Sequence, residues 1–155
     1  MLMRLVIALV LGAVLGIERE LVGKEAGIRT LIVVSGGASI FTMIALTIPY
    51  IAAQMLGTVP DPTLVAGSFG IIANVVVGIG FLGAGLIIKM GEHPRGITTA
   101  ALVWTTAAIG VLAGIGLILF ATAASTLVAL LLYILRKLNI SERIEAHPNG
   151  LRNEQ

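Results

Sequence analysis

Long uncharged stretches alternate with short charged ones along the whole chain. No charged residue occurs in 63–88 or in 96–135. At ~1.5 Å per residue in a helix, the first stretch crosses a bilayer core of ~30 Å once and the second crosses it twice. Two further apolar stretches precede them, and Arg4 in the first of these is expected to reach the headgroups. The pattern predicts five spans, at residues 2–17, 30–48, 64–88, 97–113 and 117–135.

The predicted fold class is an all-α membrane protein, a five-helix transmembrane bundle with glycine-rich close helix packing. One transmembrane domain, 1–138, is followed by a short cytoplasmic tail, 139–155. A polar loop is expected at 50–62 and a charged turn at 89–95. Three glycines are expected to form the hairpin between the last two spans: Gly110, Gly114 and Gly116.

Composition supports this prediction. Hydrophobic residues make up 57% of the chain and charged residues 12%, with a mean hydropathy of +1.05, more apolar surface than one soluble core can hide. The absence of cysteine excludes disulfides and thiolate metal sites. Because of this high hydrophobic content, the expected environment of the chain is the lipid bilayer.

The distribution of basic residues predicts the orientation. With five spans, nine of the ten Lys and Arg residues lie on one side of the membrane, and only Arg4 lies on the other. The positive-inside rule then places the amino terminus outside and the tail in the cytoplasm. The basic residues therefore report orientation, and we expect no nucleic-acid partner.

Glycines are the most prominent feature of the third predicted span. Residues 78–85 read Gly-Ile-Gly-Phe-Leu-Gly-Ala-Gly and contain the dinucleotide-binding spacing GxGxxG. The preceding strand and the later acidic residue that a nucleotide site needs are both missing, so we interpret the glycines as helix-packing positions. Close packing is expected at Gly12, Gly16, Gly78, Gly80, Gly83 and Gly85. With 19 glycines, the chain offers more flat helix surface than one bundle buries, which predicts a homodimer.

Four blocks of sequence carry a family resemblance. They are Gly-Ile-Glu-Arg-Glu at 16–20, Ala-Gly-Ile-Arg-Thr at 26–30, the glycine block at 78–85 and Arg-Gly-Ile-Thr-Thr-Ala-Ala-Leu-Val-Trp at 95–104. In this order they resemble the MgtC/SapB family of bacterial and archaeal inner-membrane proteins. The resemblance implies a five-helix membrane domain linked to magnesium limitation and, in some pathogens, to survival inside host cells. It also implies a role in regulating ATP synthesis or membrane potential.

The chain departs from the family pattern in two places. Family members commonly carry Asp-Pro-x-Arg-Ile-Ala-Ala-Gln before the glycine block, whereas residues 67–74 have glycines at the Asp and Arg positions and Asn74 at the end. A mechanism that requires this ion pair therefore lacks its residues here. Many members also carry a soluble carboxy-terminal domain, for which the tail at 139–155 is too short, so a ligand-sensing role of such a domain is not expected.

Charged and hydroxyl residues gather at the predicted cytoplasmic ends of the spans. The cluster comprises Glu18, Arg19, Glu20, Arg29, Thr30, Lys89, Arg95, Thr98 and Thr99. Glu18 and Arg19 follow a short span, so we expect them to pair below the headgroups. One interpretation of the cluster is a set of ion pairs that anchors helix ends. The other is a site for a cation, a lipid headgroup or a partner protein.

Two spans each carry a residue of special interest. Asn74 lies about a turn from the centre of its span, on the side of Gly70 and Gly78, and is expected to be buried against a helix or a wet cavity. Trp104 is expected to fill space left by the glycines. His93 and His147 lack metal-ligand spacing. No cofactor is expected, and a magnesium link comes only from the resemblance.

Enzyme motifs are absent, since the sequence has no GxSxG, no HExxH and no cysteine. We therefore expect no catalytic activity. The preferred hypothesis is a regulator of membrane energetics or ion homeostasis under magnesium limitation, acting by binding another membrane complex. The alternative is a cation channel or transporter, which normally needs ionisable residues along a path. The expected location is the bacterial or archaeal cytoplasmic membrane.

Overall fold

The computed structural model describes residues 1–90 and 93–138. In this part of the chain, five helices form the fold, and a small antiparallel hairpin pairs Ile88 with Arg95. The elements are α1 (Leu2–Leu21), α2 (Ile28–Leu56), α3 (Pro62–Leu86), β1 (Ile88–Met90), β2 (His93–Arg95), α4 (Ile97–Ile115) and α5 (Ile118–Lys137). The protein is an all-α, five-helix membrane bundle, as predicted.

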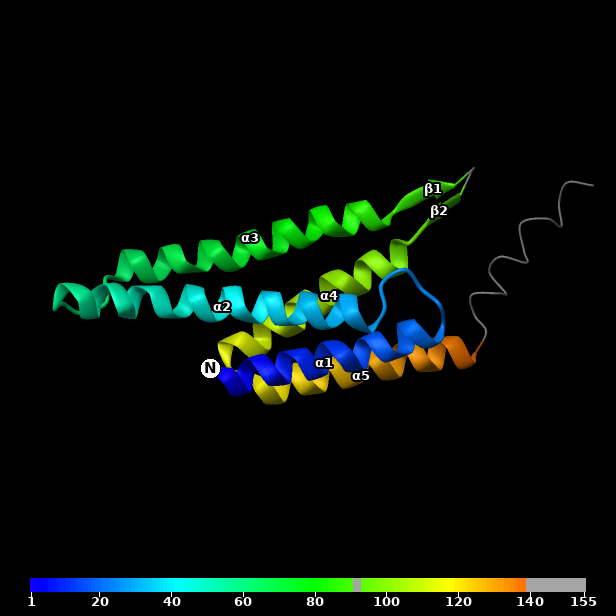
Figure 1. Cartoon of the computed structure of the whole chain (residues 1–155), viewed down its shortest axis with the longest axis horizontal. Helices are drawn as coiled ribbons and strands as arrows, with labels where there is room; N and C mark the ends of the chain where they lie inside the picture. The colour runs from blue at the N-terminus through cyan, green and yellow to red at the C-terminus, as the bar shows by residue number, and fades with distance from the viewer. Residues whose placement is uncertain (91–92, 139–155) are drawn as a thin grey trace, which may run out of the picture.

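Helix α4 lies at the centre of the bundle. It packs against all four other helices, whereas α1 and α5 lie side by side on one flank and α2 and α3 form an antiparallel pair on the other (Figure 1). Burial follows this order, because 56% of the α4 span and 50% of the α2 span are buried, against 6% for α3 and 11% for α5. The core is therefore built by α1, α2 and α4, and α3 is peripheral.

Among the described helices, four are long and apolar enough to cross a membrane: α2, α3, α4 and α5. The remaining helix, α1, has 20 residues, of which Arg4 and the last turn are charged. It lies along α2 and α5 over its length (Figure 1). Helix α1 is thus an integral part of the bundle.

The prediction that the second span ends at residue 48 and gives way to a loop is wrong. Helix α2 continues through Pro49 to Leu56. Proline removes one helical hydrogen bond, but the apolar residues that follow it keep the helical conformation. The helix ends instead at Gly57, which adopts a φ of 65°, and the Thr58 N–H donates to the Ala53 carbonyl over 2.9 Å. The loop is therefore only residues 57–61.

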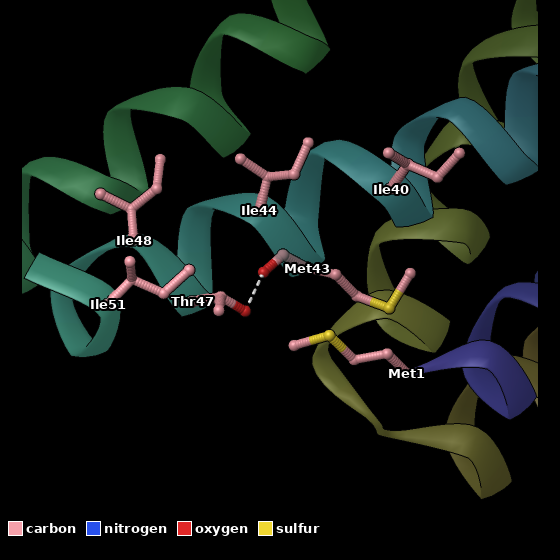
Figure 2. Close-up of a pocket in the computed structure, with 7 residues that line it drawn as sticks. All are labelled: Met1, Ile40, Met43, Ile44, Thr47, Ile48 and Ile51. Carbon is pink, nitrogen blue, oxygen red and sulfur yellow. Dashed lines mark hydrogen bonds between the residues drawn. The ribbon is translucent and has the colours of Figure 1, made fainter. Parts of the chain in front are cut away.

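The extension of α2 leaves an open groove on its second half. At the end where the loop 57–61 joins them, helices α2 and α3 extend beyond the ends of the other three helices (Figure 1). Figure 2 shows the groove that results, about 290 Å³ in volume, in which Thr47 donates back to the Met43 carbonyl. Its lining contains no charged residue and consists of Met1, Ile40, Met43, Ile44, Thr47, Ile48 and Ile51. The groove therefore offers apolar contact only.

The charged turn expected at 89–95 lies in the region of the hairpin, where β1 and β2 bring the chain from α3 to α4. Gly116 ends α4 with a φ of 105° and so makes the turn between the last two helices, as expected. Gly110 and Gly114 do not take part in that turn, because both lie within α4.

Candidate functional site

The closest helix contact in the core joins α2 and α4. A Cβ atom built on Gly114 would lie 2.8 Å from the Ser39 carbonyl oxygen, and one built on Gly110 would overlap the Ser35 carbonyl. Both serines are fully buried. The expectation that these two glycines form a hairpin is wrong, because they hold α4 against the backbone of α2.

A second close contact joins α1 and α2. A Cβ atom on Gly12 would lie 2.9 Å from the Ser35 Cβ atom, and one on Gly16 would lie 2.5 Å from the Ile28 Cα atom. Gly12 and Gly16 therefore occupy positions of close helix packing. Since Ser35 faces both Gly12 and Gly110, α2 is held between two flat helix surfaces.

The glycine block of α3 has a different environment. Within the described residues, no atom lies within 4 Å of a Cβ atom built on Gly78, Gly80 or Gly85. Gly83 has only an ordinary contact, 3.7 Å, with the Ala100 Cβ atom of α4. The packing expected at these glycines is therefore not found inside the chain, because α3 lies at the edge of the bundle.

The charged cluster lies where α1 ends and α2 and α4 begin, and we call this region the inner mouth. Its most buried charge is Arg19, whose Nε atom lies 3.2 Å from the Glu18 carboxylate. The two side chains are 6% and 15% exposed. Neither the Arg19 Nε nor the Glu18 Oε2 atom has a hydrogen-bond partner in the described residues, so direct charge attraction holds the pair.

Two other carboxylates of the inner mouth serve helix amino termini. Helix α2 has no cap of its own at Gly27, and the Ile28 N–H donates to Glu20 over 3.1 Å. At α4, the Thr99 hydroxyl donates to Glu25 over 2.9 Å. A carboxylate is stabilising at the positive end of a helix dipole. The start of α2 is therefore held by the last turn of α1, through Glu20, and the start of α4 by the loop between α1 and α2, through Glu25.

Glu25 is the functional residue that the sequence reasoning did not single out. Its own backbone N–H and the Thr99 hydroxyl hold the pKa of this carboxyl below the ordinary value of 4.5. In the sequence, Glu25 is only one of several charged residues in a connection whose positive and negative charges cancel. The available signal was Thr99, which lies in the first turn of a predicted helix, because a threonine hydroxyl that is buried there needs a hydrogen-bond acceptor.

The remaining residues of the cluster differ in exposure. Arg29, Arg95 and Thr98 are exposed, and none of them forms a salt bridge within the described residues. Thr30 is half-buried, and Lys89 belongs to β1 with its side chain outside the described part of the chain. We call Arg29, Arg95 and Thr98 the exposed rim. The inner mouth thus divides into a part that builds the fold and a part that faces solvent.

The two span residues of special interest are not where the sequence suggested. Asn74 is exposed on the outer face of α3, so the expectation of burial within the chain is wrong. Trp104 is 52% exposed and does not fill space between the helices. The physical reason is the same for both. The glycines that bring helices together lie in α1 and α4, and these helices close on α2 without a bulky side chain between them.

The described residues contain no group of three or more His, Asp or Glu side chains able to hold a metal ion. His147 lies outside the described residues, as does the side chain of His93. At its surface, the inner mouth presents the guanidinium groups of Arg29 and Arg95 and the Thr98 hydroxyl, together with the exposed carboxylates of Glu20 and Glu25.

The chain matches known proteins over most of its length. Residues 5–140 match the MgtC family. Protein MgtC of Salmonella typhimurium is 36% identical over 154 residues, covering 99% of this chain and 59% of that protein. Protein MgtC of Brucella abortus is 39% identical over 131 residues, covering 84% of this chain and 49% of that protein. The chain thus spans 49–59% of the length of these relatives, and no solved structure matches it.

Proposed function

Because the chain belongs to the MgtC family, we propose that it regulates membrane energetics or ion homeostasis under magnesium limitation. It acts by binding another membrane complex through the exposed rim. The membrane is the cytoplasmic membrane of a bacterium or archaeon, with the amino terminus outside and the inner mouth in the cytoplasm. The basic residues near the inner mouth support this orientation.

One observation carries the proposal. At the inner mouth, the fold uses Glu18, Arg19, Glu20 and Glu25, whereas Arg29 and Arg95 are exposed and form no salt bridge with a described residue. A guanidinium presents five donors in a planar fork that matches carboxylates and phosphates. The rim therefore has the chemistry to recognise an acidic surface on a partner at the cytoplasmic side.

The interior of the bundle argues against the transporter alternative. Below Arg19, the polar side chains of the described core that are fully buried are neutral hydroxyls: Ser35, Ser39, Thr42, Thr106 and Ser125. Three of these side chains bond to carbonyl groups, namely those of Thr42, Thr106 and Ser125. Close backbone contact at Gly12, Gly110 and Gly114 fills the space around the two serines of α2. A cation that crosses here would meet neither a carboxylate nor room for its ligands.

The test uses charge reversal on the rim with a matched control. We expect Arg29→Glu and Arg95→Glu to abolish growth of the host under magnesium limitation, because each places repulsive charge in the contact surface. Arg136→Glu is the control, since this exposed arginine lies in the last turn of α5. All three variants should accumulate in the membrane with unchanged melting temperature. Full growth of both rim variants would contradict the proposal.

Flux measurements separate regulation from transport. Purified protein in liposomes should move neither magnesium nor monovalent cations above the level of empty liposomes. The control for protein integrity is the melting temperature of the same reconstituted sample. Saturable cation flux that is lost when Ser39 is replaced by alanine would reject the regulator and assign transport to the core.

A further inference from the structure

The outer face of α3 combines a polar group with flat helix surface. Asn74 is the central residue of the helix Pro62–Leu86 and is exposed. In a straight helix, residues 67, 70, 78, 81 and 85 fall within about 40° of it. Four of these are glycines with no neighbour within 4 Å, and the fifth, Phe81, is 86% exposed. Gly83, which contacts α4, lies on the opposite side.

The carboxamide of Asn74 has no hydrogen-bond partner in the part of the chain that the structure describes. Among the described residues, the side-chain hydrogen bonds of α3 belong to Thr63 and Ser68. Twelve residues separate Asn74 from each end of the helix, a distance of about 18 Å, so the amide sits at the depth of the hydrocarbon. Lipid tails neither donate nor accept hydrogen bonds, so an amide at this depth is stable only against another polar group.

We propose that this face is the interface between two copies of the chain, with the Asn74 carboxamides hydrogen-bonded to each other across a two-fold axis along the membrane normal. A carboxamide both donates and accepts, so it satisfies its own copy. Two copies inserted in the same orientation bring this residue to the same depth, and a two-fold contact is self-complementary by symmetry.

The flanking residues fit the same arrangement. Gly70 and Gly78 lie one turn on either side of Asn74 and let the two backbones approach closely. Phe81 of each copy then meets the hollow that Gly78 and Gly85 leave on the other. The proposal is independent of the exposed rim, which lies at the end of the bundle and not along α3.

The first experiment measures the mass of the purified protein in mild detergent over a range of concentrations. The wild type should be a dimer. Asn74→Leu removes the amide, and Gly78→Leu removes the close approach. Each should weaken the dimer by about tenfold or more. Gly80→Leu is the control, because Gly80 has equally open space but lies about 120° away from Asn74.

At concentrations low enough to dissociate the dimer, the three variants should have the melting temperature of the wild type, since none of the three side chains touches another helix of its own chain. A wild-type protein with the mass of one chain would overturn the proposal. So would a dimer that survives Asn74→Leu unchanged, or equal loss in the Gly78 and Gly80 variants. A different protein that copurifies with monomeric wild type and is lost in Asn74→Leu would assign the face to that protein instead.

A second measurement tests the interface in the membrane without altering the amide. The chain has no cysteine, so single cysteines report one contact each. Gly70→Cys should form an oxidative cross-link between two chains in intact membranes, and Gly80→Cys should not. Cross-linking at Gly80 alone, or at neither position, would contradict the proposed face.

Discussion

Two sets of glycines occupy similar helical spacings in this protein and have opposite surroundings. Gly12 and Gly16 in α1 and Gly110 and Gly114 in α4 lie against the backbone of α2, whereas the glycines of α3 other than Gly83 have open space beyond them. All belong to long apolar helices. The comparison shows that a small-residue stripe specifies a flat surface, and that its position in the bundle decides which helix meets that surface.

The difference follows from the arrangement around α2. Ser35 has α1 on one side and α4 on the other, so a side chain on Gly12 or Gly110 would push two helices apart. Helix α3 has α2 and α4 on its inner side only, and 6% of its span is buried. The core glycines are therefore requirements of the fold, while those of α3 are available for contacts between molecules.

The largest expected effect comes from filling a core glycine. Gly110→Leu should prevent stable accumulation in the membrane, because its side chain would overlap the Ser35 backbone, which cannot move without separating α2 from α4. Overpacking of this kind costs about 1–3 kcal/mol and more where backbone must shift. Quantification of protein in isolated membranes checks this result. Gly80→Leu is the control and should accumulate like the wild type, and equal amounts of the two variants would break the comparison.

A smaller effect is expected at the carboxyl end of α4. The Arg4 guanidinium donates to the Gly114 carbonyl over 3.1 Å and so caps this helix beside its packed glycine. Arg4→Met keeps the apolar stem and removes the cap, which should lower the free energy of unfolding by about 1 kcal/mol. Denaturation in detergent measures the change. Lys137→Met, in the last turn of α5, is the control, and the same loss in both variants would argue against a capping role.

The smallest effect concerns the pH dependence at the start of α4. Because folding lowers the pKa of Glu25 below 4.5, its bond to Thr99 stabilises the protein above that pH and is lost as the pH falls through the lowered pKa. Thr99→Val should therefore be slightly less stable than the wild type at pH 7 and equally stable well below pH 4.5. Melting temperatures across this range check the prediction. A stability gap that persists at low pH would assign the effect to packing of Thr99 instead.

Much of the fold could be predicted from the sequence, because the lengths of uncharged stretches are fixed by the bilayer. The presence of five apolar helices and the close packing at Gly12 and Gly16 follow from local pattern. The continuation of α2 past Pro49 could not be predicted, since a proline ends some helices and is tolerated in others, depending on neighbouring residues.

In the candidate site, too, some features could be predicted from the sequence and others could not. The Glu18–Arg19 pair follows from the shortness of the first span, and the structure forms it. The roles of Glu20 and Glu25 depend on which helix start each carboxylate meets, and the sequence does not encode that pairing locally. Burial of Asn74 and Trp104 was inferred from their types and from their positions within the spans, and the bundle places both on its outer surface.

The central claim is that close contact with α2 gives the core glycines their structural role, and that the α3 glycines other than Gly83 have no such contact among the described residues. The most direct test is the free energy of unfolding of Gly114→Ala and Gly80→Ala in dilute detergent. We predict a clear loss for Gly114→Ala, whose Cβ atom would lie 2.8 Å from the Ser39 carbonyl. Gly80→Ala should be as stable as the wild type or more stable by up to about 1 kcal/mol, since alanine favours helix. Equal changes of the same sign in the two variants would contradict the claim.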